Sequence, residues 1–230
     1  MQFSPKSPVP VFPLPNLVLF PHVVVPLHVF ELRYRTMVRD ALSGERVIAM
    51  GLLKPGWERD YHGSPDFYPI GCLARFEEVE WLPNDCYSLV LRGLGRVTFR
   101  RIVREYPYRA ASVELLPQEP CSEDDPLVLS EKYALLELYR KLLPDPAPDP
   151  QVASAEPAAA RAGVQARPGS DLGYEALVSA VCMLVAADPI EKLQLLGLDS
   201  VIERGRRIRE LAERHRRERP APPSSSGERN

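Results

Sequence analysis

The chain contains 230 residues, of which 45% are hydrophobic and 26% carry a charge, and its formal net charge is -2 at pH 7. This composition is typical of an ordinary soluble protein, and the small net charge offers no bulk attraction for nucleic acid or for an anionic membrane. No apolar run reaches the ~20 residues that a membrane-spanning helix needs.

The first predicted element is an apolar, proline-rich stretch over residues 11–35. Its four prolines exclude a helix up to Pro26 and also exclude the middle of a hydrogen-bonded sheet. The apolar residues between the prolines therefore predict short strands, the first at 11–14. After Pro26, apolar residues recur every three or four positions from Tyr34 onward, which predicts a helix over 32–42.

The following segment, up to residue 116, has the pattern of a small β-barrel. Residues 46–53 form a short apolar run between turn signals and predict a buried strand. Beyond residue 71, apolar and polar positions alternate, which predicts antiparallel strands. We interpret Gly93-Leu94-Gly95 as a bend between two of these strands, because a phosphate-binding loop would need a third glycine and a following helix. Six or so strands are enough to close a small barrel.

The second half of the chain is predicted to be helical. Asp125-Pro126 is a favourable helix start, and an apolar stripe follows it. The stripe consists of Leu127, Leu129, Tyr133, Leu136, Tyr139 and Leu143. Three further helices are expected to begin near Asp171, Asp188 and Asp199. The expected organisation is a barrel subdomain at 1–120, a helical bundle at 121–216 that contains a disordered Pro/Ala-rich insert at about 144–170, and a disordered tail at 217–230.

No pattern of cysteines and histidines predicts a metal site, a cofactor or a catalytic centre. The four cysteines form no CxxC pair and have no histidine at ligand spacing, so they read as reduced thiols of a cytoplasmic protein. The sequence contains no GxSxG, HExxH or GxxxxGK[ST] motif. We therefore expect no enzyme. An unrecognised hydrolase stays open as an alternative, because catalytic groups assemble from distant residues.

A long loop at 55–69 holds the first candidate binding residues, Trp57, Tyr61 and Phe67. Aromatic side chains among charges are good anchors for a peptide if they are exposed. If the loop folds over the end of the barrel, the same side chains form a plug. The sequence favours neither interpretation.

A second candidate is a basic patch of Arg92, Arg96 and Arg100, which share one face of a strand. If they project into solvent together, they would suit RNA phosphates or an acidic peptide. The favoured interpretation is an outer barrel face balanced by the glutamates at 77, 78 and 80. At the 32–42 helix, Glu31 is expected to satisfy amide groups of the helix start, and one nearby arginine is expected to pair with a carboxylate across the barrel mouth.

The opening stretch resembles the start of the Lon protease N-terminal, substrate-binding domain. The residues that match the signature of that family are Pro13-Leu14, Val18-Leu19-Phe20-Pro21, Pro26-Leu27, Phe30-Glu31 and Arg33-Tyr34. Ile70-Gly71-Cys72, Trp81-Leu82-Pro83 and the run from Leu91 to Arg96 resemble later strands of the family. The likeness covers about residues 10–215 apart from the insert. It departs at Asn84-Asp85, where the family usually has Asp-Gly in a hairpin.

The resemblance implies an α+β fold, with a PUA-like antiparallel pseudo-barrel followed by a C-terminal helical bundle. It also implies a free-standing, non-catalytic module without ATPase or peptidase domains, which binds polypeptide segments or a partner protein and needs no cofactor. We expect the binding surface in a groove between barrel and bundle, with the aromatic loop at its edge. The alternative is an RNA-binding PUA-like module. Neither the ligand nor the oligomeric state follows from the sequence.

Overall fold

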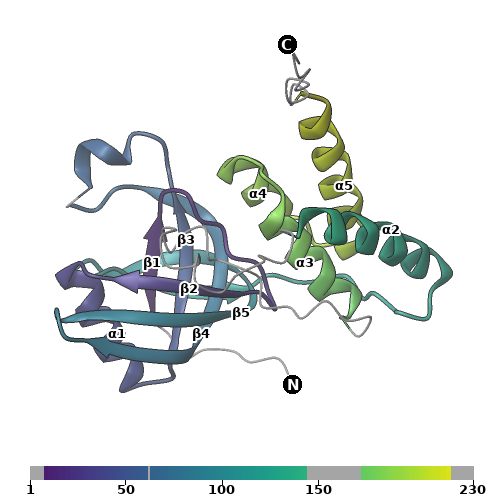
Figure 1. The fold of residues 1–230 in the computed structure, drawn as a ribbon. Coiled ribbons are helices and arrows are strands. Elements are labelled where there is room, and N and C mark those ends of the chain that lie inside the picture. Colours follow the sequence, from purple (N-terminus) through teal and green to yellow (C-terminus); the bar gives the residue numbers. More distant parts are fainter. Residues whose placement is uncertain (1–7, 62, 144–171, 219–230) are drawn as a thin grey trace, which may run out of the picture.

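The computed structural model describes residues 8–61, 63–143 and 172–218 (Figure 1). The insert expected at 144–170 lies outside the described residues, as does all but the start of the tail expected at 217–230. The last helix continues to Glu218, so the first two residues of that expected tail are helical. Within the described residues, no helix is both long and apolar enough to cross a membrane.

Six strands and a bundle of helices form the expected α+β fold. The strands are β1 Val9–Leu14, β2 Val24–Val29, β3 Val47–Leu53, β4 Phe67–Leu82, β5 Cys86–Arg104 and β6 Ala110–Leu115. They pair in the order β2-β5-β4-β3-β1-β6, and a further pairing of β5 with β6 closes β5, β4, β3, β1 and β6 into a ring. The sheet is mixed rather than purely antiparallel, because β1 runs parallel to β3.

Strand β5 is continuous for 19 residues, although the sequence predicted two strands separated at residues 93–95. The first half of β5 pairs with β2 and the second half with β6. At Gly93 the chain from Phe20 to Val23 crosses β5, and a Cβ atom on Gly93 would lie 2.1 Å from the carbonyl oxygen of Phe20. The Gly93 amide donates to the carbonyl of Val23 at 2.9 Å. The glycine therefore permits a close crossing and does not end the strand.

Alternate residues of the sheet belong to two apolar clusters. Val47 and Ala49 join a small cluster built from all five strands of the closed ring. Ile48 and Met50 join a much larger cluster, which includes the buried face of helix α1 (Leu32–Leu42) and continues into the bundle. The predicted bounds of α1 are confirmed. Because successive side chains of a strand face opposite ways, the middle of the sheet is covered on both faces.

The bundle consists of α2 Pro126–Leu142, α3 Tyr174–Leu184, α4 Pro189–Leu196 and α5 Val201–Glu218. Asp125 caps α2 as predicted, since its side chain accepts from the Leu127 amide at 2.8 Å. Helix α3 is buried over most of its surface. The stripe predicted for α2 is partly wrong, because Leu127 and Tyr133 are exposed while Val128 and Leu135 are buried. Helix α2 has apolar residues on two sides, and only one side contacts α3 and α5.

Two buried arginines meet at the end of α4, and one of them, Arg96, joins the barrel to the bundle. Arg96 on β5 is 3% exposed and donates to the carbonyl oxygens of Leu196 and Pro117 and to Asp199. Arg204 on α5 is fully buried and donates to the carbonyl oxygen of Leu195 at 3.0 Å. Carbonyl groups at a helix C-terminus have no partner inside the helix, so these guanidinium groups satisfy them from two different elements.

Candidate functional site

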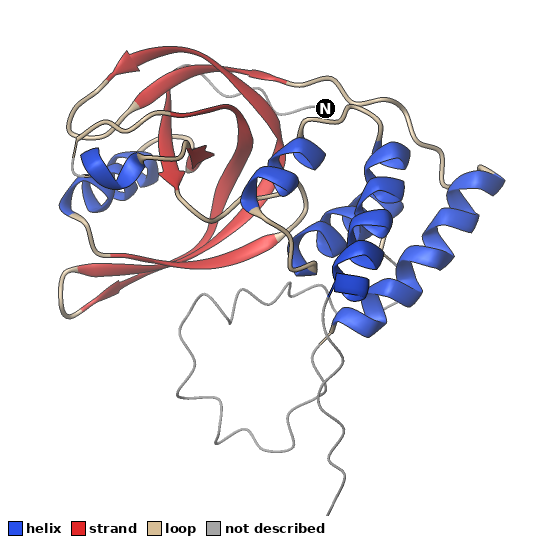
Figure 2. Ribbon diagram, turned by 90° about the horizontal axis from the view of Figure 1, so that it is seen from above, coloured by secondary structure: helices blue, strands red, loops and turns tan. Residues whose placement is uncertain are grey.

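The aromatic loop lies between β3 and β4 and contains a short 3-10 helix, Trp57–Asp60. Figures 1 and 2 show it on the side of the barrel away from the bundle. Contacts from Arg33 of α1 to the loop carbonyls of Tyr61 and Gly63 agree with this position. The prediction that the loop borders a groove between barrel and bundle is therefore wrong, because the loop and the bundle occupy opposite ends.

A polar staple fastens the loop to the start of α1. The Tyr61 hydroxyl donates to the Glu31 carboxylate at 2.5 Å, and Arg33 donates to the same carboxylate and to the Tyr61 carbonyl oxygen. Burial, together with the hydrogen bond and charge of Glu31, raises the pKa of Tyr61 to about 12. Glu31 makes no side-chain cap to the helix amides, so the prediction of that role is wrong. Its carboxylate holds the loop instead.

Trp57 contributes to the same fastening. Its ring lies 5.4 Å from the ring of Tyr61, measured between centroids, in an edge-on arrangement. Trp57 and Tyr61 are both half-buried. Part of their apolar surface is therefore buried in contacts within the loop, and part of the Trp57 ring is accessible to solvent.

Phe67, the third aromatic candidate, begins β4 and packs into the barrel wall. Its ring meets that of Phe99 at a centroid distance of 4.9 Å and an angle of 83°. The guanidinium of Arg109 lies 4.7 Å over the Phe67 ring and donates to the carbonyl oxygen of Pro65 at 2.6 Å. Burial lowers the pKa of Arg109, and the Phe67 ring and the Pro65 carbonyl oxygen contact its guanidinium. These contacts hold Phe67 in one orientation.

An open cavity of about 270 Å³ lies beside Phe67. Its lining residues are Ser64, Asp66, Phe67, Pro69, Phe99, Arg100, Arg101, Ile102, Glu105 and Arg109. A second cavity of about 30 Å³ shares Ser64, Glu105 and Arg109 with it and adds Tyr106, which is 77% exposed. We call the two cavities and Tyr106 the barrel-end surface. It combines an apolar floor with charged groups at the rim, as binding sites commonly do.

The structure does not bring the three arginines of the predicted basic patch together. Arg96 points into the junction with the bundle, as described above. Arg92 forms an ion pair with Glu77 on β4, as the balanced-face interpretation predicted. Arg100 pairs with Glu114 on β6 and lines the larger cavity of the barrel-end surface. Sequence alternation could not show that a helical layer would cover Arg96.

The described histidines have partners other than a nucleophile. His22 lies 3.4 Å from Glu175, and His215 lies 3.3 Å from Glu191. His28 stacks on Phe30 at a centroid distance of 6.3 Å. His62 lies outside the described residues. In the part of the chain that the structure describes, no cluster of three or more histidine, cysteine or acidic side chains is placed to hold a metal ion.

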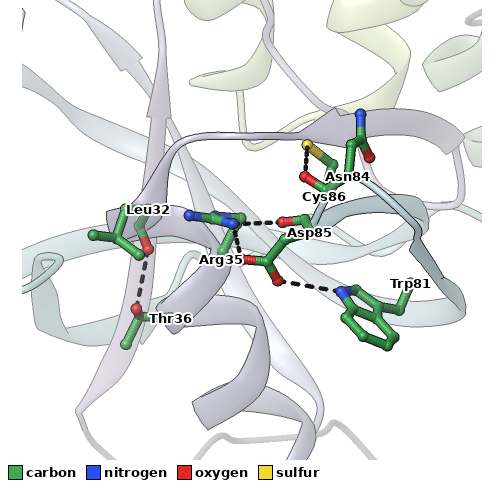
Figure 3. A network of polar contacts seen from close by, with 7 residues as sticks. All are labelled: Leu32, Arg35, Thr36, Trp81, Asn84, Asp85 and Cys86. Carbon is green, nitrogen blue, oxygen red and sulfur yellow. Dashed lines mark hydrogen bonds and ion pairs between the residues drawn. The ribbon is translucent and has the colours of Figure 1, made fainter.

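A second network joins α1 to the β4–β5 hairpin (Figure 3). Arg35 donates to the Asp85 carbonyl oxygen at 2.7 Å and pairs with its carboxylate, which also accepts from the indole of Trp81 at 3.3 Å. This is the expected pairing of an arginine with a carboxylate. Asp85 has φ 58°, the left-handed conformation that a hairpin glycine usually adopts. The carboxylate at this position thus anchors the hairpin to α1.

Sequence reasoning did not identify the exposure of Tyr106 and Trp81. Trp81 is 66% exposed because β4 pairs with β3 only as far as Arg75, so the hairpin projects beyond the rest of the sheet. Tyr106 lies at the turn between β5 and β6. Its exposure depends on which strands surround that corner.

The chain is similar to a known protein family over most of its length. A family model described as the ATP-dependent protease La (LON) substrate-binding domain matches residues 8–214. The Lon protease of Anaeromyxobacter dehalogenans (strain 2CP-C) is 34% identical over 115 residues, which are 50% of this chain and 14% of that protein. Lon protease 2 of Herpetosiphon aurantiacus is 28% identical over 204 residues, which are 86% of this chain and 23% of that protein. The chain thus spans less than a quarter of the length of these relatives.

Two solved structures have the same fold. A crystal structure of a Lon N-terminal domain protein from Xanthomonas campestris superposes with a TM-score of 0.59 at 22% identity, covering 90% of this chain and 98% of that one. The N-terminal domain of the Mycobacterium avium complex Lon protease superposes with a TM-score of 0.60 at 17% identity, covering 91% and 100%. At these identities the likeness shows the fold alone.

Proposed function

Because this chain belongs to the family of ATP-dependent protease La (LON) substrate-binding domains, we propose that it is a recognition module that binds polypeptide segments. The matched family model describes the part of these proteases that binds substrate, not the part that cleaves it. The proposed activity is therefore non-catalytic binding of unfolded or extended chains, or of a partner protein that presents such a segment.

The observation that carries the location of the site is the barrel-end surface. Phe67 forms the apolar floor of its larger cavity in a fixed orientation, and Tyr106, which is 77% exposed, lines the smaller adjoining cavity. A rigid floor next to an exposed aromatic ring is a favourable site for apolar side chains of a flexible partner, because little ordering of the protein is needed on binding. In this proposal Phe67 contacts the ligand, Trp57 lies at the rim, and Tyr61 positions the loop.

The test measures binding of an unfolded chain by fluorescence anisotropy. The probe is fluorescein-labelled lysozyme that has been reduced and alkylated, so that it cannot refold. Tyr106→Ala should raise the Kd by about fivefold to tenfold, as expected for loss of one aromatic anchor. Trp81→Ala is the matched control, since it removes another largely exposed aromatic side chain, at the β4–β5 hairpin.

The two variants separate the possible results. An unchanged Kd for Tyr106→Ala together with a raised Kd for Trp81→Ala would place binding at the hairpin and contradict the proposed location. No measurable binding of the unfolded probe by the unaltered chain would contradict the proposed function itself. Circular dichroism of both variants establishes that each retains the fold.

We do not propose the RNA-binding alternative. It requires Arg92, Arg96 and Arg100 to project into solvent together, and Arg96 is buried against the bundle. The remaining two arginines each pair with a carboxylate, which offsets their attraction for phosphate.

A further inference from the structure

The pairing of β4 with β5 ends before β5 itself ends. The last paired residues are Ile70 of β4 and Thr98 of β5, whereas β5 continues to Arg104. Beyond Thr98, β5 pairs with β6 along its other side. Among the strands that the structure describes, none pairs with the β4-facing side of residues 99–104. We call these six residues the free edge of β5.

The free edge is accessible and has space beside it. Arg100, Arg101, Val103 and Arg104 are exposed, and Phe99 and Ile102 are half-buried. The larger cavity of the barrel-end surface is lined by residues 99–102 on one side and by the loop at Ser64 and Asp66 on the other. Six residues of strand extend about 20 Å, which is long enough to pair with an added strand of similar length. An unpaired strand edge offers main-chain donors and acceptors to such a strand.

The charges beside the free edge favour an acidic occupant. Arg100 is already paired with Glu114, and the Arg104 guanidinium lies 4.1 Å from the centre of the Tyr108 ring. Arg101 forms no ion pair with any residue that the structure describes, and it lines the cavity. Of the two carboxylates in the cavity lining, that of Asp66 is paired with Lys54, and that of Glu105 interacts electrostatically with Arg109. A partner with acidic side chains therefore meets an unpaired cation.

From this arrangement we infer that the free edge of β5 captures an extended acidic segment of an unfolded polypeptide by strand addition. The segment hydrogen-bonds through its main chain to residues 99–104 and places an apolar side chain in the cavity against Phe67 and Ile102. Its neighbouring acidic side chains lie near Arg101. This inference rests on the proposed function and specifies its ligand, namely a chain in which acidic and apolar residues alternate.

The test uses a fluorescein-labelled eight-residue peptide in which glutamate alternates with valine. In an added strand, only every second amide faces the protein, so two complementary N-methylated peptides are compared with the parent. One methylation pattern should weaken binding at least about tenfold, because the loss of several main-chain hydrogen bonds is combined with a steric clash. The other pattern should change the Kd less than about twofold, because its amides face away from β5.

Charge is tested on both partners. A peptide with lysine in place of glutamate should bind more weakly than the parent. Arg101→Glu should raise the Kd of the glutamate peptide about fivefold at low salt, and less at high salt. Arg216→Glu is the matched control, since it makes the same change at an exposed position near the end of α5, far from the cavity.

Two outcomes would overturn the inference. Equal effects of the two methylation patterns would exclude strand addition, and equal Kd values for Arg101→Glu and Arg216→Glu would exclude the edge as the site. If the unfolded lysozyme probe still binds in either case, the proposed function stands and only strand addition fails. If neither that probe nor the glutamate peptide binds the unaltered chain, the proposed function fails as well.

Discussion

Replacing Arg96 with methionine should destabilise the whole chain, because this side chain joins the barrel to the bundle. Methionine keeps most of the length and apolar contact of the arginine stem but donates no hydrogen bond. The carbonyl oxygens of Leu196 and Pro117 then lose the Arg96 donors. Asp199 loses a partner too, but its side chain is 49% exposed and water can replace the arginine.

The magnitude follows from these contacts. Each buried carbonyl that loses its donor lowers the free energy of unfolding by about 1–3 kcal/mol. The sum over the two carbonyls is the upper limit of the destabilisation. Removal of the buried guanidinium recovers part of its desolvation penalty, which reduces the total. We therefore expect the free energy of unfolding to fall by about 2–4 kcal/mol. Arg92→Met on the same strand is the control, and its exposed ion pair with Glu77 should account for less than about 1 kcal/mol.

Urea unfolding followed by circular dichroism and tryptophan fluorescence provides the measurement. Since one apolar cluster runs from the barrel into the bundle, we propose that the two expected subdomains unfold in one transition in the unaltered chain. In Arg96→Met the midpoint should shift to lower urea concentration for both probes. Equal losses for Arg96→Met and Arg92→Met would refute the assignment of Arg96 as the joint. Two separated transitions in the unaltered chain would refute the single cooperative unit.

Three further predictions concern individual side chains. Hydrogen bonds from Lys132 and the Tyr174 amide lower the pKa of Glu123 below its ordinary 4.5. The ionised Glu123 side chain should therefore stabilise the fold above pH 4.5, and this stabilisation should disappear as the pH falls through the lowered pKa. The difference in unfolding free energy between the unaltered chain and Glu123→Gln should shrink in acid accordingly. Tyr61→Phe should lower stability by about 1 kcal/mol at neutral pH and by less above pH 10, where the unfolded tyrosine ionises first; a constant difference up to pH 12 would contradict the raised pKa. Burial raises the pKa of the Cys72 thiol to about 12, so mass spectrometry after treatment with a thiol reagent at neutral pH should find this cysteine unlabelled in the folded chain and labelled in urea.

Much of the local structure could be predicted from the sequence. The bounds of α1 follow from the last proline of the opening stretch and the apolar spacing after it. The start of α2 follows from Asp125 and Pro126. The Asp125 side chain caps the first helical turn, and the ring of Pro126 fixes a backbone angle that suits the first helical position. The opening stretch also carries the family resemblance, which agrees with the barrel and the bundle that the strand and helix patterns predict.

The candidate site was only partly predictable. Phe67 was identified as an aromatic residue of a long loop and does line a cavity, but Tyr61 of the same loop is held by Glu31. Sequence composition could not distinguish these two roles, since both residues lie among charges in one segment. The exposure of Tyr106 could not be predicted, because it depends on the elements around the turn between β5 and β6.

The sequence by itself determined the short-range features of this protein: where helices begin, where prolines interrupt them, and which residues of a strand share a face. Only the tertiary structure decided which faces are covered. Arg92 and Arg100 lie on the outside of β5, whereas the bundle covers Arg96, and the free edge exists because β4 and β5 separate beyond Thr98. The physical reason is that strand partners and covering helices come from distant parts of the chain, whereas caps, turns and periodicity act between near neighbours.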